Sequence, residues 1–328
     1  MCRESRQGDA SAVISYAECG LAVGHATDVD GATGCTVIRG TTEPFACGVS
    51  LPGRATATRE IALLEPTQLV DRVDAILLTG GSAYGLDAAA GIMRWMERNA
   101  RGYPVGVGVV PIVPAAALFD LAPLGRFDAR PTADMAEAAC DAATPEPEEG
   151  SVGAGTGATV GKIGGVATAM KGGLGAAAAR AGEIVVNAIA VVNALGDVRD
   201  ANGRIIAGAR GANNAWVDTA ARMADGRNDN SAFADLAGRN TTLCVVSTNA
   251  ALGRTQLATL ARASSAALFR RITPVATSFD GDIVFATAPL AGGLKAEPSQ
   301  VESLAVQALE MAIERAVRTS VPGEIFRG

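Results

Sequence analysis

A threonine pair follows an asparagine where a polar segment gives way to an apolar strand. The polar segment, 222–239, leads into Asn240-Thr241-Thr242 and the strand-like stretch TTLCVVST. A threonine at such a position can become a nucleophile if the peptide bond before it is cut. The new α-amine, with a pKa of about 7.7–8.0, can then act as general base for its hydroxyl. Two simpler interpretations exist: threonine favours strands, and Asn-x-Thr is a glycosylation signal, although no secretory signal accompanies it.

Composition leaves little room for histidine or thiol chemistry. His25 is the one histidine among 328 residues, so a Ser/His/Asp triad or a multi-histidine metal site would depend on it alone. The six cysteines are scattered along the chain: Cys2, Cys19, Cys35, Cys47, Cys140 and Cys244. They form no CxxC pair, which is typical of reduced structural thiols rather than of disulfides or a metal cage. We therefore expect no metal and no cofactor.

A glycine-rich segment, GSVGAGTGATVGKIGGVATAMK, spans 150–171. It does not match a phosphate-binding loop, because Gly161-Lys162 is followed by Ile163 and the residue five before Gly161 is Thr156 rather than glycine. The segment also follows an acidic loop instead of the strand that a dinucleotide fingerprint needs. Two interpretations stay open: a crossing where backbones approach closely, or a loop that delivers Lys162 into an active site.

Other polar positions could support a threonine nucleophile. Asp280 and Asp282 flank Gly281 directly before the strand-like stretch IVFATA. Two carboxylates this close could share a proton or orient a nucleophile, although Asp-Gly is also typical of a tight hairpin turn. Tyr84 lies in LLTGGSAYGLDAA, at a predicted strand-to-helix turn where its hydroxyl could face a cleft. Asn193 ends an apolar strand in AVVNALGDV, where it could instead satisfy a turn.

The elements that must position these residues alternate between strands and helices. Strands rich in branched aliphatic residues are predicted at 34–38, 75–78, 105–113, 183–192, 242–247 and 283–286. Helices with an apolar stripe are predicted at 86–99, 255–270 and 300–318. The pattern favours an α/β fold in which layers of helix cover sheet.

Charge and hydropathy exclude several classes of protein. Lys+Arg 28 against Asp+Glu 34 gives a net charge of −6, which argues against a nucleic-acid binder. The apolar run at 184–196 falls short of the ~18 residues of a membrane span and is predicted to be one buried strand. The first 20 residues mix charged and small side chains and lack the pattern of a signal peptide. We expect a cytoplasmic protein that binds neither nucleic acid nor membrane.

Taken together, the motifs resemble the DmpA-type aminopeptidase family, which includes L-aminopeptidase/D-amidases, β-peptidyl aminopeptidases and the nylon-oligomer endohydrolase. The resemblance runs from about Gly20 to about Pro289, over seven motifs in the same order: GLAVGHATDVDGATGCTVI, LLTGGSAYGLDAAAG, PVGVGVVPIVPAAALFDL, GSVGAGTGATVGK, AVVNALGDV, NTTLCVVSTNA and SFDGDIVFATA. The threonine and the Asp-Gly-Asp turn look more like the nylon-oligomer hydrolase branch than like the founding aminopeptidases, whose nucleophile is serine.

The resemblance implies a four-layer αββα sandwich of the amino-terminal-nucleophile hydrolase type. It implies one domain over 1–328 that cuts itself between Asn240 and Thr241 into a large chain, 1–240, and a small chain, 241–328. Thr241 would be the nucleophile. The residues supporting it would be two carboxylates, two pocket residues and an oxyanion donor: Asp280, Asp282, Lys162, Asn193 and Tyr84.

The expected function is that of an autoprocessed amidohydrolase acting as an aminopeptidase on short peptides or amino-acid amides. Two alternatives use the same nucleophile. One is an endo-acting amidase on ω-amino-acid oligomers of the nylon type, and the other is an acyltransferase that passes acyl groups to amines. By the same family likeness, the processed heterodimers are expected to assemble into a homo-oligomer.

Overall fold

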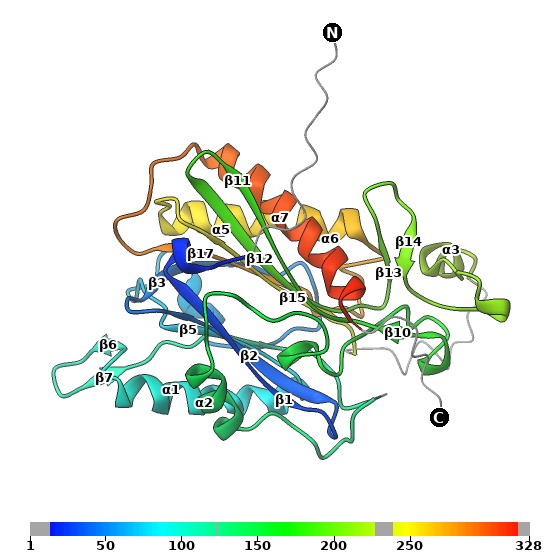
Figure 1. The fold of residues 1–328 in the computed structure, drawn as a ribbon, viewed down its shortest axis with the longest axis horizontal. Coiled ribbons are helices and arrows are strands. Elements are labelled where there is room, and N and C mark those ends of the chain that lie inside the picture. Colours follow the sequence, from blue (N-terminus) through cyan, green and yellow to red (C-terminus); the bar gives the residue numbers. More distant parts are fainter. Residues whose placement is uncertain (1–13, 123, 227–238, 321–328) are drawn as a thin grey trace, which may run out of the picture.

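Two stacked sheets form the centre of the molecule, with helices on both outer faces (Figure 1). The computed structural model describes residues 14–122, 124–226 and 239–320. The first sheet has the strand order β1 (Leu21–Asp28), β2 (Thr33–Gly40), β5 (Ala75–Thr79), β8 (Ala115–Ala117), β4 (Ala57–Arg59). The second has the order β11 (Gly173–Ala181), β12 (Ile184–Asn193), β15 (Thr241–Thr248), β17 (Ile283–Pro289), β3 (Phe45–Ser50).

Helices and short strand pairs complete the fold. The α helices of the described ranges are α1 (Ala89–Arg98), α2 (Ala133–Asp141), α3 (Thr219–Ala224), α5 (Arg254–Ser264), α6 (Ala266–Arg271) and α7 (Pro298–Arg318). The 3₁₀ turns are η1 (Ala17–Cys19), η2 (Ile61–Leu64), η3 (Ser82–Ala88), η4 (Gly153–Gly155), η5 (Val166–Thr168) and η6 (Ala212–Asn214). The short strands are β6 (Tyr103–Pro104), β7 (Val109–Val110), β9 (Thr159–Val160), β10 (Met170–Lys171), β13 (Asp197–Arg199), β14 (Ile205–Ala207) and β16 (Ile272–Thr273).

Alternation along the strands separates three apolar layers. In β2, Val37 packs with α1 and α2, whereas its neighbour Ile38 packs between the sheets. In β15, Val246 faces the α5 and α7 side, and Val245 faces the first sheet. Successive strand residues point to opposite faces, so each sheet is apolar on both sides and must be covered on both. The predicted αββα sandwich is confirmed.

Most predicted strands are present, with one clear error. The stretches 34–38, 75–78, 183–192, 242–247 and 283–286 lie in β2, β5, β12, β15 and β17. The predicted strand at 105–113 is instead the hairpin of β6 and β7, closed by the Val105 N–H donating to the Gly108 carbonyl at 3.0 Å. Val107 at its tip is 98% exposed. Branched aliphatic residues favour strands only where a sheet buries them.

The long helix α7 lies where the sequence predicts it, but the other two predicted helices differ from their expected ranges. The stretch 86–99 begins as the 3₁₀ turn η3 and becomes α1 only at Ala89, and 255–270 breaks between α5 and α6. At that break, the hydroxyls of Ser264 and Ser265 donate to the carbonyls of Leu260 and Ala261. Such side-chain bonds to the preceding turn bend helices.

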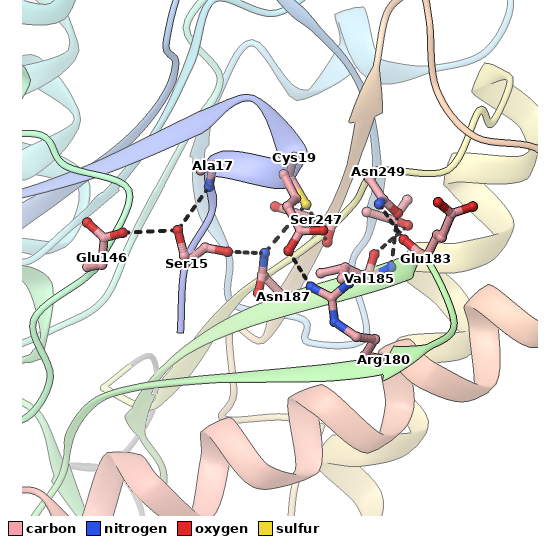
Figure 2. A network of polar contacts seen from close by, with 12 residues as sticks. Ser15, Ala17, Cys19, Glu146, Arg180, Glu183, Val185, Asn187, Ser247 and Asn249 are labelled. Carbon is pink, nitrogen blue, oxygen red and sulfur yellow. Dashed lines mark hydrogen bonds and ion pairs between the residues drawn. The ribbon is translucent and has the colours of Figure 1, made fainter. Parts of the chain in front are cut away.

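The described amino-terminal segment is fastened to the second sheet by a polar network (Figure 2). The side-chain amide of Asn187, on β12, donates to the Ser15 carbonyl at 3.0 Å, and the Cys19 thiol donates to the Ser247 carbonyl at 3.5 Å. Burial raises the pKa of Cys19 to about 12. The five cysteines of the described ranges are free and buried, as expected for structural thiols, and Cys2 lies outside those ranges. None of the described helices is long and apolar enough to cross a bilayer.

We expect Phe285→Ala to destabilise the protein severely. Phe285 is fully buried on β17 between the two sheets. Truncating such a side chain removes its burial energy and leaves a cavity, at a cost of about 3–5 kcal/mol. Phe269→Ala is the control, because Phe269 on α6 is 58% exposed and its loss should cost less than about 0.5 kcal/mol. Urea unfolding measures both, and equal midpoints would contradict the assigned core.

Candidate active site

The register between β12 and β15 places Thr241 beside Asn193. The two residues are direct partners in the antiparallel ladder, so their side chains share one face. That face is the inner one, because Leu243 and Val191, two residues along each strand, pack between the sheets. Thr241 is 3% exposed and Asn193 is fully buried. The nucleophile predicted from sequence thus lies at the end of the inter-sheet core.

Two donors converge on the carbonyl oxygen of Asn240, which belongs to the peptide bond joining Asn240 to Thr241. The Thr241 hydroxyl donates to this oxygen at 2.7 Å, and the Gly281 backbone N–H donates to it at 2.8 Å. A Cβ on residue 281 would lie 2.5 Å from the Ala55 carbonyl oxygen and 2.7 Å from Thr241 Oγ1. Glycine is needed here for this close approach and not for a hairpin turn.

Asn193 and Lys162 surround the preceding carbonyl, that of Arg239. Lys162 Nζ donates to the Arg239 carbonyl at 3.0 Å and to Asn193 Oδ1 at 2.8 Å. The Asn193 amide donates to the Arg239 carbonyl at 3.2 Å and to the Phe119 carbonyl at 3.1 Å. Its Oδ1 also accepts from the Thr159 N–H at 3.0 Å, so the orientation of the amide is set from both ends.

The glycine-rich segment positions Lys162 beside Asn193 and the Arg239 carbonyl. Gly161, with φ +69°, packs so closely on the segment after β14 that a Cβ would lie 2.0 Å from the Ala209 nitrogen. Its left-handed conformation turns the chain from β9 toward Asn193. Lys171 has a different place, because its ammonium donates to the carbonyls of Gly155 and Ala158, at 2.8 and 3.2 Å, within the segment itself. Of these two lysines, Lys162 lies beside the threonine.

Asp280 and Asp282 lie on the opposite side of Thr241, and backbone donors hold both carboxylates. Asp282 accepts from the Thr242 N–H at 2.7 Å and from the Ala276 N–H at 3.1 Å. Asp280 accepts from the N–H and the hydroxyl of Thr277, at 2.8 and 2.7 Å. Asp280 also pairs with Asn240 in a short parallel bridge, so both ends of the Asp-Gly-Asp motif are tied to the chain around Thr241.

Comparison with known proteins assigns this arrangement to a family. Residues 19–324 match peptidase family S58. The chain belongs to that family. It is 39% identical over 305 residues to an uncharacterized aminopeptidase of Mycobacterium tuberculosis, covering 86% of this chain and 82% of that protein. It is 31% identical over 278 residues to the 6-aminohexanoate-oligomer endohydrolase of a Kocuria strain, covering 81% of this chain and 72% of that protein.

Solved structures of other proteins share the fold of this S58 chain. A Burkholderia β-aminopeptidase superposes with a TM-score of 0.68 at 20% identity, over 94% of this chain and 88% of that one. The L-aminopeptidase D-Ala-esterase/amidase of Ochrobactrum anthropi, described as a variant of the Ntn-hydrolase fold, gives 0.67 at 21% identity, over 92% and 84%. The predicted family and fold are confirmed, and membership makes the chain a hydrolase of peptide or amide bonds.

Burial shifts the pKa of the ionisable groups around Thr241 toward neutrality. It lowers the pKa of Lys162 to about 7, against the opposing attraction of Asp280. It raises the pKa of Asp282 to about 7, with a further contribution from repulsion by Asp280, whose own pKa is also raised by burial. Groups that titrate near pH 7 are suited to general acid–base work in this S58 site.

Tyr84 is the one sequence-predicted site residue that makes no contact within this cluster. It lies on η3, is 56% exposed, and has the Arg130 guanidinium 3.6 Å from its ring centre. The turn starts close to the site, since the Ser82 N–H donates to the carbonyl of Leu118, one residue before Phe119. The role of Tyr84 as an oxyanion donor stays a prediction.

The structure adds groups that sequence reasoning missed. Gly281 and Thr159 act through backbone N–H groups, and Thr277 acts through both its N–H and its hydroxyl. Thr277 carried a weak signal, because a threonine three residues before an aspartate favours local side-chain bonding of this kind. A backbone N–H is present in every residue except proline, so the amino-acid type does not indicate which N–H groups donate. The polar segment at 222–239 falls largely outside the described residues.

We expect Asp282→Asn to flatten the pH dependence of stability. The folded chain keeps the Asp282 carboxyl protonated up to about pH 7, whereas the unfolded chain releases this proton near its ordinary pKa of 3.8. The folded state therefore binds the extra proton between about pH 4 and 7, and stability falls as pH rises through this range. One such proton contributes at most about 1.4 kcal/mol per pH unit.

The measurement compares urea unfolding from pH 4 to 7 in a Thr241→Ala chain with and without Asp282→Asn, so that the Thr241 hydroxyl takes no part in the comparison. The chain that keeps Asp282 should show the steeper decline. Identical slopes would mean that Asp282 is ionised in the folded protein throughout this range.

Proposed function

We propose that this chain is a self-processing amide hydrolase that cuts itself between Asn240 and Thr241 and then uses Thr241 as an amino-terminal nucleophile. The supporting observation is the pair of contacts on the Asn240 carbonyl. The nucleophile's hydroxyl and the Gly281 N–H both bind this oxygen, at 2.7 and 2.8 Å. A hydroxyl next to the carbonyl that it must attack, with a fixed backbone donor for the developing oxyanion, meets the geometric needs of acyl transfer.

Self-cleavage would proceed as an acyl shift within one residue. Thr241 Oγ1 attacks the carbonyl carbon of Asn240, the C–N bond breaks, and the hydroxyl proton passes to the departing nitrogen of Thr241. The product is an ester between Asn240 and the threonine side chain. Water then opens this ester and leaves a carboxylate on Asn240 and a free α-amine on Thr241. The amine has a reference pKa of about 7.7–8.0, so it is partly neutral at physiological pH and can accept a proton.

Substrate hydrolysis would repeat the same steps on an external amide. The α-amine of Thr241 takes the hydroxyl proton as the oxygen attacks, and then gives it to the leaving amine. Water releases the acyl group. Because the nucleophile carries its own base, this reaction needs neither histidine nor metal, in agreement with the composition.

The remaining predicted residues would have supporting roles. Asn193 and Tyr84 would donate to the oxyanion together with Gly281. Lys162, which bonds Asn193 at 2.8 Å, would hold the amide in position and adjust the local charge. Asp282 and Asp280 would keep the nucleophile's strand start in place, since Asp282 binds the N–H of the next residue, Thr242, at 2.7 Å. Once ionised, their carboxylates would also stabilise the ammonium form of Thr241.

The substrates would be short peptides or amino-acid amides. The mycobacterial relatives carry the name aminopeptidase, and the Kocuria relative is an oligomer endohydrolase. Removal of terminal residues and internal cleavage therefore both occur among the named activities of similar chains.

Replacing the nucleophile should keep the chain whole. We expect purified wild-type protein to contain two chains, 1–240 and 241–328, the smaller beginning with Thr241, whereas Thr241→Ala should be one inactive chain. Thr241→Ser is the matched control, because serine keeps the hydroxyl and should still be cut. Mass spectrometry and amino-terminal sequencing report the outcome. An active wild-type preparation made of a single unbroken chain would refute the proposal.

Moving the backbone donor should slow self-cleavage. In Gly281→Ala the new methyl group would clash with the Ala55 carbonyl and with Thr241 Oγ1. Displacing an oxyanion donor costs about 100-fold or more in rate. Gly108→Ala is the control, because a Cβ there meets nothing within 4 Å. The fraction of cut chain over time, read on a denaturing gel, should fall only in Gly281→Ala. Equal rates in both variants would show that the Gly281 N–H does not act as an oxyanion donor in self-cleavage.

A further inference from the structure

A buried carboxylate next to the active site takes no part in the proposed reaction steps. Asp120 directly follows Phe119 and is 1% exposed. Its Oδ1 accepts from the Gly81 N–H at 2.6 Å, and its Oδ2 accepts from the Thr33 hydroxyl at 2.7 Å. Taking a carboxylate out of water costs free energy that its donors must offset, so a buried carboxylate is weak evidence of a role in stability. The contacts of Asp120 therefore point to another role.

Asp120 connects two segments that carry predicted oxyanion donors. The carbonyl of its neighbour Phe119, in the segment after β8, accepts from the Asn193 amide at 3.1 Å. Gly81, which donates to Asp120, directly precedes η3, and Tyr84 lies three residues further along that turn. One hydrogen bond of the carboxylate thus joins the turn that carries Tyr84 to the segment that holds the Asn193 amide.

The surrounding backbone encloses this carboxylate closely. A Cβ on Gly80 would lie 2.0 Å from Asp120 Oδ2, and a Cβ on Gly157 would lie 2.6 Å from Asp120 Cβ. Gly81 has φ +79°, a conformation that residues with a Cβ rarely adopt. Burial raises the pKa of Asp120 to about 6, against the opposing attraction of Lys171, so the carboxyl is mainly ionised at neutral pH. These close approaches leave the carboxylate little room to move.

Tyr84 depends on the backbone of its turn for its position, because its side chain is 56% exposed and the core holds little of it. We propose that Asp120 is a positioning residue that fixes the η3 turn, and so Tyr84, relative to Asn193. Two donors act together on one developing oxyanion only if their spacing is fixed, and a misplacement of about 1 Å can cost about 100-fold in rate. This inference rests on the proposed function and adds to it a residue that acts through others.

Removing the carboxylate should slow turnover without weakening substrate binding. Asp120→Ala should lower kcat by about 10-fold or more and change KM little, because displaced donors lose an interaction made in the transition state. Asp120→Asn should restore most of this loss. Its amide oxygen can still accept from the Gly81 N–H, and its amide nitrogen can donate to the Thr33 hydroxyl. Rates are measured on alanine p-nitroanilide, trialanine and a linear 6-aminohexanoate trimer, using fully cut protein.

Asp74→Ala is the matched control. Asp74 is also a buried carboxylate, 2% exposed, and it accepts from a backbone N–H, that of Ile112, at 2.8 Å. It precedes the first residue of β5, whereas Gly80 and Gly81 follow the last, so it lies at the opposite end of the same strand. Its loss should lower the urea midpoint and leave kcat unchanged at temperatures where the variant is folded.

A double-variant cycle tests whether Asp120 acts through Tyr84. Tyr84→Phe removes the hydroxyl and should lower kcat in the otherwise wild-type enzyme. In the Asp120→Ala background the same change should have a much smaller effect, because the hydroxyl is already displaced. In the Asp74→Ala background its effect should be undiminished. Equal effects of Tyr84→Phe in both backgrounds would mean that Asp120 only supports the fold, and would refute the proposal.

Thr33→Val gives a second route if Asp120→Ala does not fold or is not cut. Valine has nearly the size of threonine and removes the hydroxyl that donates to Asp120 Oδ2, so kcat should fall by a smaller factor with KM unchanged. Unchanged kcat in Asp120→Ala or Thr33→Val, or Asp120→Asn as slow as Asp120→Ala, would refute positioning by these hydrogen bonds and leave the amide hydrolase intact. No hydrolysis of any of the three substrates by fully cut wild-type protein would overturn the proposed function and the role of Asp120 together.

Discussion

The antiparallel register between β12 and β15 is the constraint on which the site depends. It places Asn193 opposite Thr241, on the face between the two sheets. A one-residue shift of β15 along β12 would turn the Thr241 side chain toward the helices on the outer face, because successive strand residues alternate. The register is held by long apolar strands buried on both faces, so the position of the threonine is determined by the whole core rather than by local contacts.

The fold places hydrogen-bond donors on one side of the segment 239–241 and two carboxyl groups on the other. Lys162 and Asn193 approach Arg239 from the β9 loop and β12, while Asp280 and Asp282 approach from the start of β17. Burial moves the pKa of Lys162 downward and that of Asp282 upward, both to about 7. Such groups can exchange protons at neutral pH, where exposed lysines and aspartates would stay fully ionised.

Family membership and the local chemistry indicate the same class of reaction, the hydrolysis of peptide or amide bonds. Relatives that are similar to this chain carry names for terminal and for internal cleavage. In this chain two successive carbonyls accept hydrogen bonds, that of Arg239 from Lys162 and Asn193 and that of Asn240 from Gly281.

Sequence alone determined the residue types that can react and the strands that carry them. The single histidine, the Asn-Thr-Thr junction and the apolar strands 183–192 and 242–247 are local patterns, and they predicted the nucleophile and the layered fold. The prediction was wrong for the branched aliphatic residues of 105–113, because alternation does not show whether a sheet covers them. Only the tertiary structure decided that Lys162 rather than Lys171 contacts Asn193, and that Gly281 gives room and an N–H to Thr241. These contacts join segments more than 30 residues apart in the sequence, and the Gly281 contact uses a backbone N–H, so local patterns of side-chain types could not specify them.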